Sequence, residues 1–375
     1  MLNYDLKNVI DIKIIMIYNY IIMSLEKLIN TMDINTMDIN YDYNKTDIDN
    51  KLYKYLKFNI NLDNNDYDEL ICDKIDKIYI DNRIELLNKY RKQLRILKCK
   101  PYFKQKTKEW LDLRKTCLTA SDLHDALNKN NLLLAKKKAG VYIDNIIYHS
   151  IPPLKWGTMF EDMAQRCYSQ KNNIDVHEFG LLNNEKISHF GASPDGITDI
   201  GIMVEIKCPY SRKIKENFIP PKYYYQIQGQ LAVCELNECD YIECDFKIID
   251  TDYEYIDYVN ENNLGKKNHG IIAEYFDNIA DEYYYIYSDV LLTAYETIVN
   301  INKQMLLQDN KDKKFCKLSR WVLNEMYIQR VFYNEKLWND ILPKIEEFWN
   351  KVNDCRQLPI EYKKIKSKKF KFIPE

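Results

Sequence analysis

Two acidic residues and a lysine are placed where they could do chemistry together. Asp195 lies in a Ser-Pro-Asp-Gly sequence, and Glu205, Ile206 and Lys207 follow in an apolar stretch. Side chains alternate along a strand, so Glu205 and Lys207 share a face, and a turn at 198–201 would bring Asp195 beside Glu205. Two neighbouring carboxylates repel unless a cation lies between them, and Mg²⁺ favours carboxylates, carbonyls such as that of Ile206, and water. Lys207 would then orient a water molecule or stabilise charge on a phosphate.

The same residues also fit a simpler structure. A Glu and a Lys two positions apart on an exposed strand face are common and weakly stabilising. Pro, Asp and Gly are typical turn residues, so Ser-Pro-Asp-Gly alone does not require a metal site. A hairpin with a charged outer face remains the alternative.

Glu161, in the sequence WGTMFE, is a third acidic candidate. Thr158 and Glu161 have the spacing of a capping box, in which the glutamate bonds a backbone N–H in the first turn of a helix. In the alternative interpretation, Glu161 faces the metal as a third acid.

Polar residues elsewhere could serve a phosphate or the metal site. Gln226 and Gln230 are one helical turn apart, a spacing that is more often found on a surface. Arg114 and Ser121 are both able to bind phosphate oxygens, Arg114 through its planar guanidinium and Ser121 through its hydroxyl.

The elements that must position these residues follow from hydrophobic periodicity and turn signals. A helix near Asp122 would be capped by Ser121 or Thr119. We expect helices over 66–100, 155–172, 221–236, 270–307 and 335–352, and strands over 187–207, 239–249 and 320–334.

Composition sets wider limits. The 375 residues are 46% hydrophobic, enough for a core, and the net charge of −2 gives no global signal for nucleic acid.

The apolar stretch 12–23 is too short to span a membrane, and the N-terminus lacks the features of a signal peptide. The ten cysteines form no C-x-x-C pair, which favours free thiols. An iron–sulfur site at Cys234, Cys239 and Cys244 is the alternative, although cluster ligands this close normally lie in a loop.

One local exception to the charge balance lies upstream of Arg114. Residues 89–108 contain nine Lys or Arg and no Asp or Glu. This run is either a solvated helix face or a surface that faces the phosphates of DNA.

The motifs are weak signals individually, but their order along the chain is specific. Arg114 and the TAS that ends at Ser121 are followed by WGTMFE, SPDG, VEIKCP and YYYQIQGQ. This series over residues 110–250 resembles the lambda-exonuclease/YqaJ viral recombinase family of PD-(D/E)XK nucleases. The resemblance implies an α/β fold with a restriction-endonuclease-like core, in which helices flank a mixed central β-sheet, with N- and C-terminal helical extensions.

The resemblance also implies roles for individual residues. Asp195, Glu205 and the Ile206 carbonyl resemble ligands of Mg²⁺ or Mn²⁺, and Lys207 resembles the residue that activates or positions water. The remaining positions resemble an acid near a second metal (Glu161), a glutamine beside the site (Gln226) and residues that hold a 5′-phosphate (Arg114, Ser121 and Ser193).

The implied activity is metal-dependent hydrolysis of DNA, typically 5′→3′ at double-stranded ends, in viral recombination or end processing. Double-stranded DNA ends and a single-strand annealing protein are the expected partners, without a membrane, and the oligomeric state stays open. We expect an intracellular protein, in the host cytoplasm or a viral factory. Two alternatives remain: a structure-specific or nicking endonuclease of the same superfamily, and a DNA-binding module with a degenerate nuclease site.

The expected organisation has six parts. They are a low-complexity extension (1–60), a basic helical lead-in (61–109), the nuclease core (110–250), a helical insertion (251–319), a closing strand and helix (320–360) and a basic tail (361–375).

Overall fold

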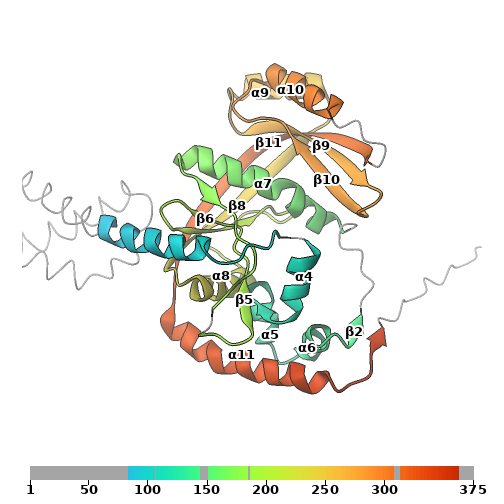
Figure 1. Cartoon of the computed structure of the whole chain (residues 1–375). Coiled ribbons are helices and arrows are strands. Elements are labelled where there is room, and N and C mark those ends of the chain that lie inside the picture. The colour runs from blue at the N-terminus through green and yellow to red at the C-terminus, as the bar shows by residue number, and fades with distance from the viewer. Residues whose placement is uncertain (1–82, 106, 144–150, 185, 308–312, 363–375) are drawn as a thin grey trace, which may run out of the picture. The chain divides into compact units, whose positions relative to one another are not determined.

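The computed structural model describes residues 83–105, 107–143, 151–184, 186–307 and 313–362 (Figure 1). The expected extension 1–60, the first part of the lead-in and nearly all of the basic tail lie outside these residues. The chain divides into two compact units, residues 1–92 and 93–375. Nearly all of the described helices and strands belong to the second unit. A helix over residues 83–98 agrees with the predicted lead-in helix.

A seven-stranded mixed sheet forms the centre of the second unit. Its strand order is β10-β9-β11-β8-β7-β6-β3, and the β7–β8 pair is parallel while the other neighbouring pairs are antiparallel. The strands are β3 (Val176–His177), β6 (Gly196–Thr198), β7 (Met203–Lys207), β8 (Glu238–Ile249), β9 (His269–Asp277), β10 (Glu282–Tyr287) and β11 (Lys313–Phe332). Smaller sheets join β1 (Leu118–Thr119), β5 (Phe190–Ala192) and β4 (Leu182–Asn183), and β12 (Glu361–Tyr362) with β2 (Tyr142–Ile143).

Helices cover both faces of this sheet. They are α4 (Lys108–Lys115), α5 (Leu123–Ala126), α6 (Leu132–Lys138), α7 (Pro152–Asn172), α8 (Pro221–Cys234), α9 (Asp252–Glu261), α10 (Ala294–Leu306) and α11 (Glu335–Cys355), with a 3-10 turn at Ala120–Asp122. The expected architecture, a mixed sheet flanked by helices, is confirmed.

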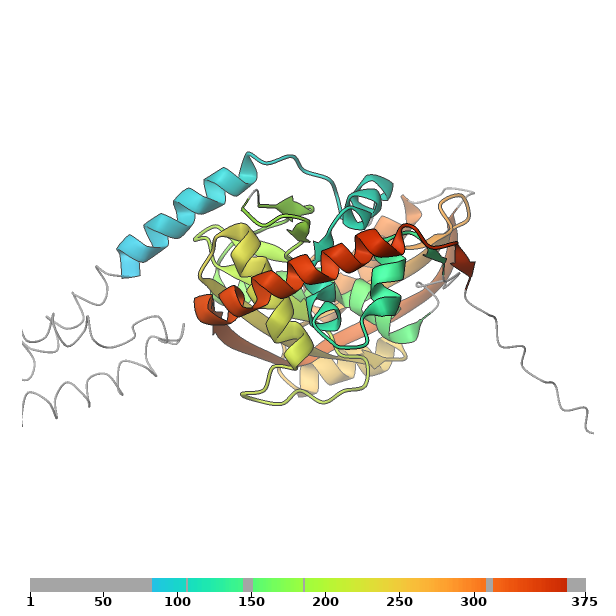
Figure 2. The same cartoon turned by 90° about the horizontal axis from the view of Figure 1, so that it is seen from below.

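Strand β7 shows how the two faces are filled. Val204 and Ile206 pack with α7 in one apolar cluster, whereas Met203 packs with α8 and α11 in another. Figure 2 shows α11 running across the layer that contains α8. Because side chains alternate along a strand, Glu205 and Lys207 belong to the α8 face, as Met203 does.

Local sequence explains where the two helices beside the site begin and end. Both α7 and α8 start with proline, whose fixed φ suits the first helical turn and whose missing N–H costs nothing there. Both end at a residue with positive φ, Asn173 at 50° and Glu235 at 52°. The predicted helix over 221–236 is therefore confirmed.

The expectation that 251–319 is helical is wrong in part. Helices α9 and α10 are present, but β9, β10 and the start of β11 lie between and after them. These strands extend the central sheet, where β9 is buried over most of its length between β10 and β11. A strand buried on both faces gives a continuous apolar run, which periodicity cannot distinguish from a helix.

The first of the two strands expected over 187–207 is divided into β5 and β6, which belong to different sheets, whereas the second is β7. Predictions for the C-terminal elements agree with the structure. The predicted 320–334 strand matches β11 up to Phe332, and the predicted 335–352 helix is α11. Cys234 ends α8 whereas Cys239 and Cys244 lie in β8, and all three are buried free thiols, so they do not share a ligand loop. No helix in the described part of the chain is both long and apolar enough to cross a membrane.

Candidate active site

The predicted hairpin places Asp195 against β7. Strands β6 and β7 pair antiparallel, with Gly196 opposite Val204. Asp195 Oδ2 accepts a hydrogen bond from the Ile206 backbone N–H at 2.7 Å. In an antiparallel register the N–H and C=O of a residue point to the same edge, so the Ile206 carbonyl is directed toward the edge where Asp195 lies.

Close packing of neighbouring strands explains why the last residue of Ser-Pro-Asp-Gly, Gly196, is a glycine. A Cβ atom on Gly196 would lie 2.3 Å from Val176 Cγ1 on β3 and 3.1 Å from Val204 Cγ2 on β7. A side chain here would push β6 away from its two neighbouring strands. Gly196 therefore allows the close approach that sets the position of Asp195.

Glu205 is fully buried and surrounded by donors. Gln226 Nε2 donates to its Oε1 and Gln230 Nε2 donates to its Oε2, each at 2.7 Å. Lys207 forms a direct ion pair with the same carboxylate. Tyr223, whose ring lies 5.1 Å from the Lys207 ammonium, shares a face of α8 with both glutamines. One helix face thus orients the carboxylate on the facing strand.

The charges of this group are strongly coupled. Burial raises the pKa of Asp195 well above its ordinary value, and the nearby carboxylates of Glu205 and Glu161 raise it further. Burial acts to lower the pKa of Lys207, but Glu205 and Asp195 outweigh it and the pKa of Lys207 is raised. Asp195 thus lies near two other carboxylates and one cation, Lys207. The excess of negative charge favours binding a further cation.

Glu161 does not lie where the capping-box interpretation puts it. Helix α7 begins at Pro152, so Thr158 and Glu161 are inside the helix and not in its first turn. The two prolines before Leu154, rather than Thr158, mark the start of the helix. Glu161 is instead close enough to Asp195 to raise its pKa.

The residues expected to hold a phosphate form a second cluster next to the acids. Arg114 Nη2 donates to Ser121 Oγ at 3.1 Å and to Thr119 Oγ1 at 3.3 Å. The Arg114 guanidinium also lies over the Trp110 ring, 4.3 Å from its centroid. Trp110 Nε1 in turn donates to Ser193 Oγ at 3.0 Å. Arg114, Ser121 and Ser193 are therefore brought together, as sequence reasoning expected.

The second cluster is joined to the first through α8. Gln230 Nε2, which donates to Glu205, also lies 3.3 Å from the Ser193 carbonyl oxygen. Gln230 Oε1 is buried and has no hydrogen-bond partner within the described structure. The sequence indicated Gln230 only as a surface-like neighbour of Gln226; their spacing of one turn was the available signal.

Two further charged residues support the phosphate cluster and were missed. Lys138 Nζ lies 3.0 Å from Asp122 Oδ2 and donates to the Arg114 carbonyl oxygen at 3.2 Å. Thr119 Oγ1 donates to Asp122 Oδ2 at 2.9 Å. Lys138 is the last of three consecutive lysines at the end of α6, so its sequence context gave no sign of its partners. The expected side-chain cap by Ser121 or Thr119 is not formed; Thr119 takes the N-cap position but bonds side chains instead.

The acids fit a hard divalent cation in ligand type, since carboxylate and carbonyl oxygens are what Mg²⁺ prefers. Within the described ranges, no three His, Cys, Asp or Glu side chains are placed so that they could hold a metal ion. Glu205 is engaged with Lys207 and two glutamines instead.

Comparison with known proteins agrees with the motif order. Residues 109–237 match the family model described as the YqaJ-like viral recombinase domain. An uncharacterised protein of Acanthamoeba polyphaga mimivirus is 28% identical over 341 residues, which cover 78% of this chain and 60% of that protein. The chain thus spans about three fifths of the length of this relative.

Two solved structures are similar over most of their own length. An alkaline exonuclease from Laribacter hongkongensis is 19% identical, covers 66% of this chain and 93% of its own, and gives a TM-score of 0.41. A phage-related exonuclease from Haemophilus somnus 129PT is 11% identical, covers 64% and 93%, and gives a TM-score of 0.35. The motifs Arg114–Ser121, WGTMFE, SPDG and VEIKCP all lie inside residues 109–237, the segment that is similar to the YqaJ-like viral recombinase domain family.

Proposed function

We propose that the protein is a Mg²⁺- or Mn²⁺-dependent deoxyribonuclease that degrades double-stranded DNA from its ends, in the 5′→3′ direction. The observation that carries this proposal is the mutual placement of Asp195, Glu205 and Lys207, with Glu161 near enough to raise the pKa of Asp195. The match of residues 109–237 to the YqaJ-like viral recombinase domain supports the same reaction class.

Asp195, Glu205, the Ile206 carbonyl and Glu161 would hold the metal. A metal held there would supply Lewis-acid chemistry, polarising the scissile phosphate and making water more acidic. Gln226 and Gln230 fix the orientation of Glu205, so the carboxylate presents its remaining lone pairs in one direction. Asp195 is fixed in the same way by the Ile206 N–H.

Lys207 supplies the positive charge beside the reacting phosphate. Its raised pKa keeps the ammonium protonated at neutral pH, so it is a hydrogen-bond donor and not a general base. In this role it orients the attacking water or stabilises the charge that builds on the phosphate oxygens. The proposal requires the Lys207 ammonium to move from Glu205 to the phosphate.

Arg114, Ser121 and Ser193 would bind a terminal 5′-phosphate. Arg114 offers a planar guanidinium, which suits two phosphate oxygens at once. The Ser121 hydroxyl bonds Arg114 itself, and the Ser193 hydroxyl bonds the Trp110 ring on which Arg114 lies. Because Ser193 is two residues before Asp195, binding the end of a strand here would position the adjacent phosphodiester at the acids.

The test is digestion of linear duplexes labelled at the 5′ or the 3′ end, with and without a 5′-phosphate, beside covalently closed circles. We expect cleavage with Mg²⁺ or Mn²⁺ but not with EDTA, early release of the 5′ label, faster reaction of phosphorylated ends and intact circles. Intact linear duplex in the presence of either metal contradicts the proposal. Cutting of closed circles would identify a structure-specific or nicking endonuclease instead.

A further inference from the structure

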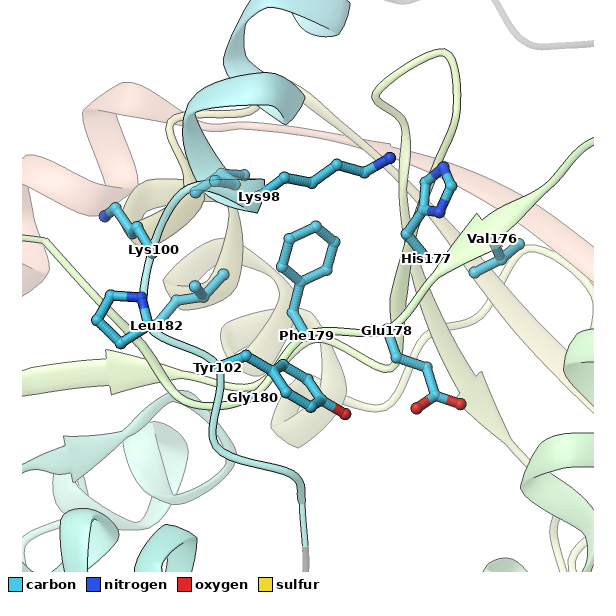
Figure 3. A pocket seen from close by; sticks show the side chains of 11 residues that line it. Lys98, Lys100, Tyr102, Val176, His177, Glu178, Phe179, Gly180 and Leu182 are labelled. Atoms are coloured by element: carbon cyan, nitrogen blue, oxygen red, sulfur yellow. The ribbon is translucent and has the colours of Figure 1, made fainter.

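A pocket of about 560 Å³ lies outside the group of acids (Figure 3). One wall comes from residues within 97–102, which lie inside the basic run 89–108, and the other comes from residues within 176–182. The volume is in the range of small-molecule sites, which is about 300–1,000 Å³. None of the proposed nuclease residues lines it, so its purpose is not explained by the metal site.

The two walls are held together by contacts to backbone carbonyl oxygens. Lys100 Nζ donates to the Asn183 carbonyl oxygen at 2.7 Å. A Cβ atom on Gly180 would lie only 2.2 Å from the Phe103 carbonyl oxygen, so the two segments touch at this glycine. The pocket is therefore formed before any ligand arrives.

One side chain links the pocket to the residue before Asp195. Gln105 Nε2 donates to the Phe179 carbonyl oxygen at 2.9 Å and to the Pro194 carbonyl oxygen at 3.1 Å. Phe179 lines the pocket, and Pro194 directly precedes Asp195. The pocket is thus next to the loop on which strand cleavage is proposed to depend.

The lining combines aromatic rings with hydrogen-bonding groups of both kinds. In Figure 3 the Lys98 ammonium and the His177 ring lie along one side, the Tyr102 ring and Glu178 along the other, and the Phe179 ring between them. Tyr102 is 54% exposed, so its ring is available for contact with a ligand. Burial and the Glu178 carboxylate raise the pKa of Tyr102, which keeps the phenol protonated.

We propose that this pocket binds a nucleotide of single-stranded DNA, with the base against the exposed ring of Tyr102, above the buried Phe179, and the phosphate beside Lys98 and His177. Aromatic surfaces next to cationic side chains are how proteins bind single strands without reading sequence. Glu178 can accept a hydrogen bond from the amino group of a base such as cytosine, whereas it would repel an acidic peptide. The inference rests on the proposed function, because degrading one strand of a duplex leaves the other single-stranded beside the site.

Binding is measured by fluorescence anisotropy of full-length protein with a short fluorescein-labelled oligo(dC) in EDTA, which prevents cleavage. Tyr102→Ala should raise Kd about fivefold or more, since stacking of one base contributes at least about 1 kcal/mol. Tyr102→Phe keeps the ring and should restore binding. Lys98→Ala should lower the slope of log K against log salt by about 0.7.

Lys303→Ala is the matched control, because Lys303 is an exposed lysine on α10 and its removal changes the net charge equally. Its Kd and salt slope should equal those of the wild type. If Tyr102→Ala and Lys98→Ala also bind like the wild type, the proposal is wrong. Lys98-dependent binding of fluorescein-labelled oligo-glutamate, with oligo(dC) binding unaffected, would overturn it in favour of an acidic peptide.

Digestion of labelled duplex with Mg²⁺ by the same proteins separates the two proposals. A wild type that does not cut, but binds oligo(dC) through Tyr102, disproves the nuclease function and leaves the pocket inference intact. A wild type that cuts, with oligo(dC) binding independent of Tyr102 and Lys98, disproves the pocket inference alone.

Discussion

Trp110 donates its indole N–H to Ser193 Oγ at 3.0 Å and carries the guanidinium of Arg114 on its ring. A residue of α4 therefore contacts both a phosphate-binding candidate on its own helix and one on the loop that leads to Asp195. Ser193 and Arg114 are far apart in sequence, so their relative position depends on this contact.

Trp110→Phe should reduce the preference for 5′-phosphorylated ends. The phenyl ring still supports Arg114, but Ser193 loses a hydrogen bond that contributes about 1 kcal/mol, so the preference should fall about fivefold. The measurement is the ratio of kcat/KM on phosphorylated and hydroxyl ends. Trp156→Phe is the control, because the buried Trp156 indole N–H has no hydrogen-bond partner within the described structure. Equal losses on both kinds of end would contradict a role for Trp110 in phosphate recognition.

Lys207→Met should abolish cleavage while DNA binding survives. Removing one preorganised donor from a developing charge typically costs about 100-fold or more in rate. Cleavage is measured with Mg²⁺ on end-labelled duplex, and binding by anisotropy in EDTA. Lys222→Met removes an exposed lysine that pairs with Asp125, and it should cut at the wild-type rate. Cleavage by Lys207→Met at that same rate would remove Lys207 from the mechanism.

The local geometry of the acids was predictable, because side chains alternate between the two faces of a strand and a short turn joins the two strands. The pattern placed Glu205 and Lys207 on one face and brought Asp195 beside them, as observed. Glu161 shows the limit of local patterns: its capping-box spacing is genuine, but Pro152 starts the helix earlier.

Long-range placement was less accessible. Strands β9 and β10 have apolar runs that also fit helices, and only their pairing with β11 and with each other decides between the two. Lys138 meets Asp122 and Arg114 through the packing of α6, and no spacing rule connects those positions. Residues such as Lys138, which contact the site from a distant element, could therefore not be predicted from the sequence.

Gln230→Leu should lower kcat and raise the Mg²⁺ concentration that gives half-maximal activity. The buried Glu205 carboxylate loses a donor at 2.7 Å, and a hydrogen bond to a charged group contributes about 1.5–3 kcal/mol. We therefore expect about a tenfold to hundredfold loss in kcat, with KM for DNA little changed. Gln304→Leu, on α10, serves as the control. A change in KM alone would assign Gln230 to DNA binding rather than to positioning Glu205.

Arg330→Met should destabilise the fold far more than Arg320→Met. The Arg330 side chain is fully buried; its Nε donates to Asp240 Oδ1 at 2.7 Å, and it also pairs with Glu238. Its removal takes a cation away from two buried carboxylates, which costs about 3–5 kcal/mol. Arg320 is itself largely buried, but it pairs with Asp252 and the Asp250 carbonyl oxygen, and both residues are exposed. Water can solvate these partners when Arg320 is removed, so its loss should cost less, about 1 kcal/mol. Urea denaturation at pH 7 measures both, and similar costs would contradict this account.

His269 should make the free energy of unfolding fall as the pH is lowered below about 6.5. Burial lowers the pKa of His269 from its ordinary value. The neutral ring suits its surroundings, because Nδ1 lies 2.6 Å from Tyr255 Oη and Nε2 lies 3.0 Å from the Gly265 carbonyl oxygen. A carbonyl requires a donor, so Nε2 carries the proton and Nδ1 accepts from the phenol.

The sign of the effect follows from proton uptake. Below the unfolded-state pKa of about 6.5 the unfolded chain binds a proton that the folded chain resists, so this contribution to stability is present above pH 6.5 and is lost as the pH falls toward the folded pKa. Urea denaturation of the wild type and His269→Gln between about pH 5 and 7.5 isolates the contribution of His269 to the free energy of unfolding. All other titrating groups are present in both proteins, so their effects cancel in the difference. The wild type should lose stability faster than the variant as the pH falls. Parallel curves would show that His269 has the same pKa in both states.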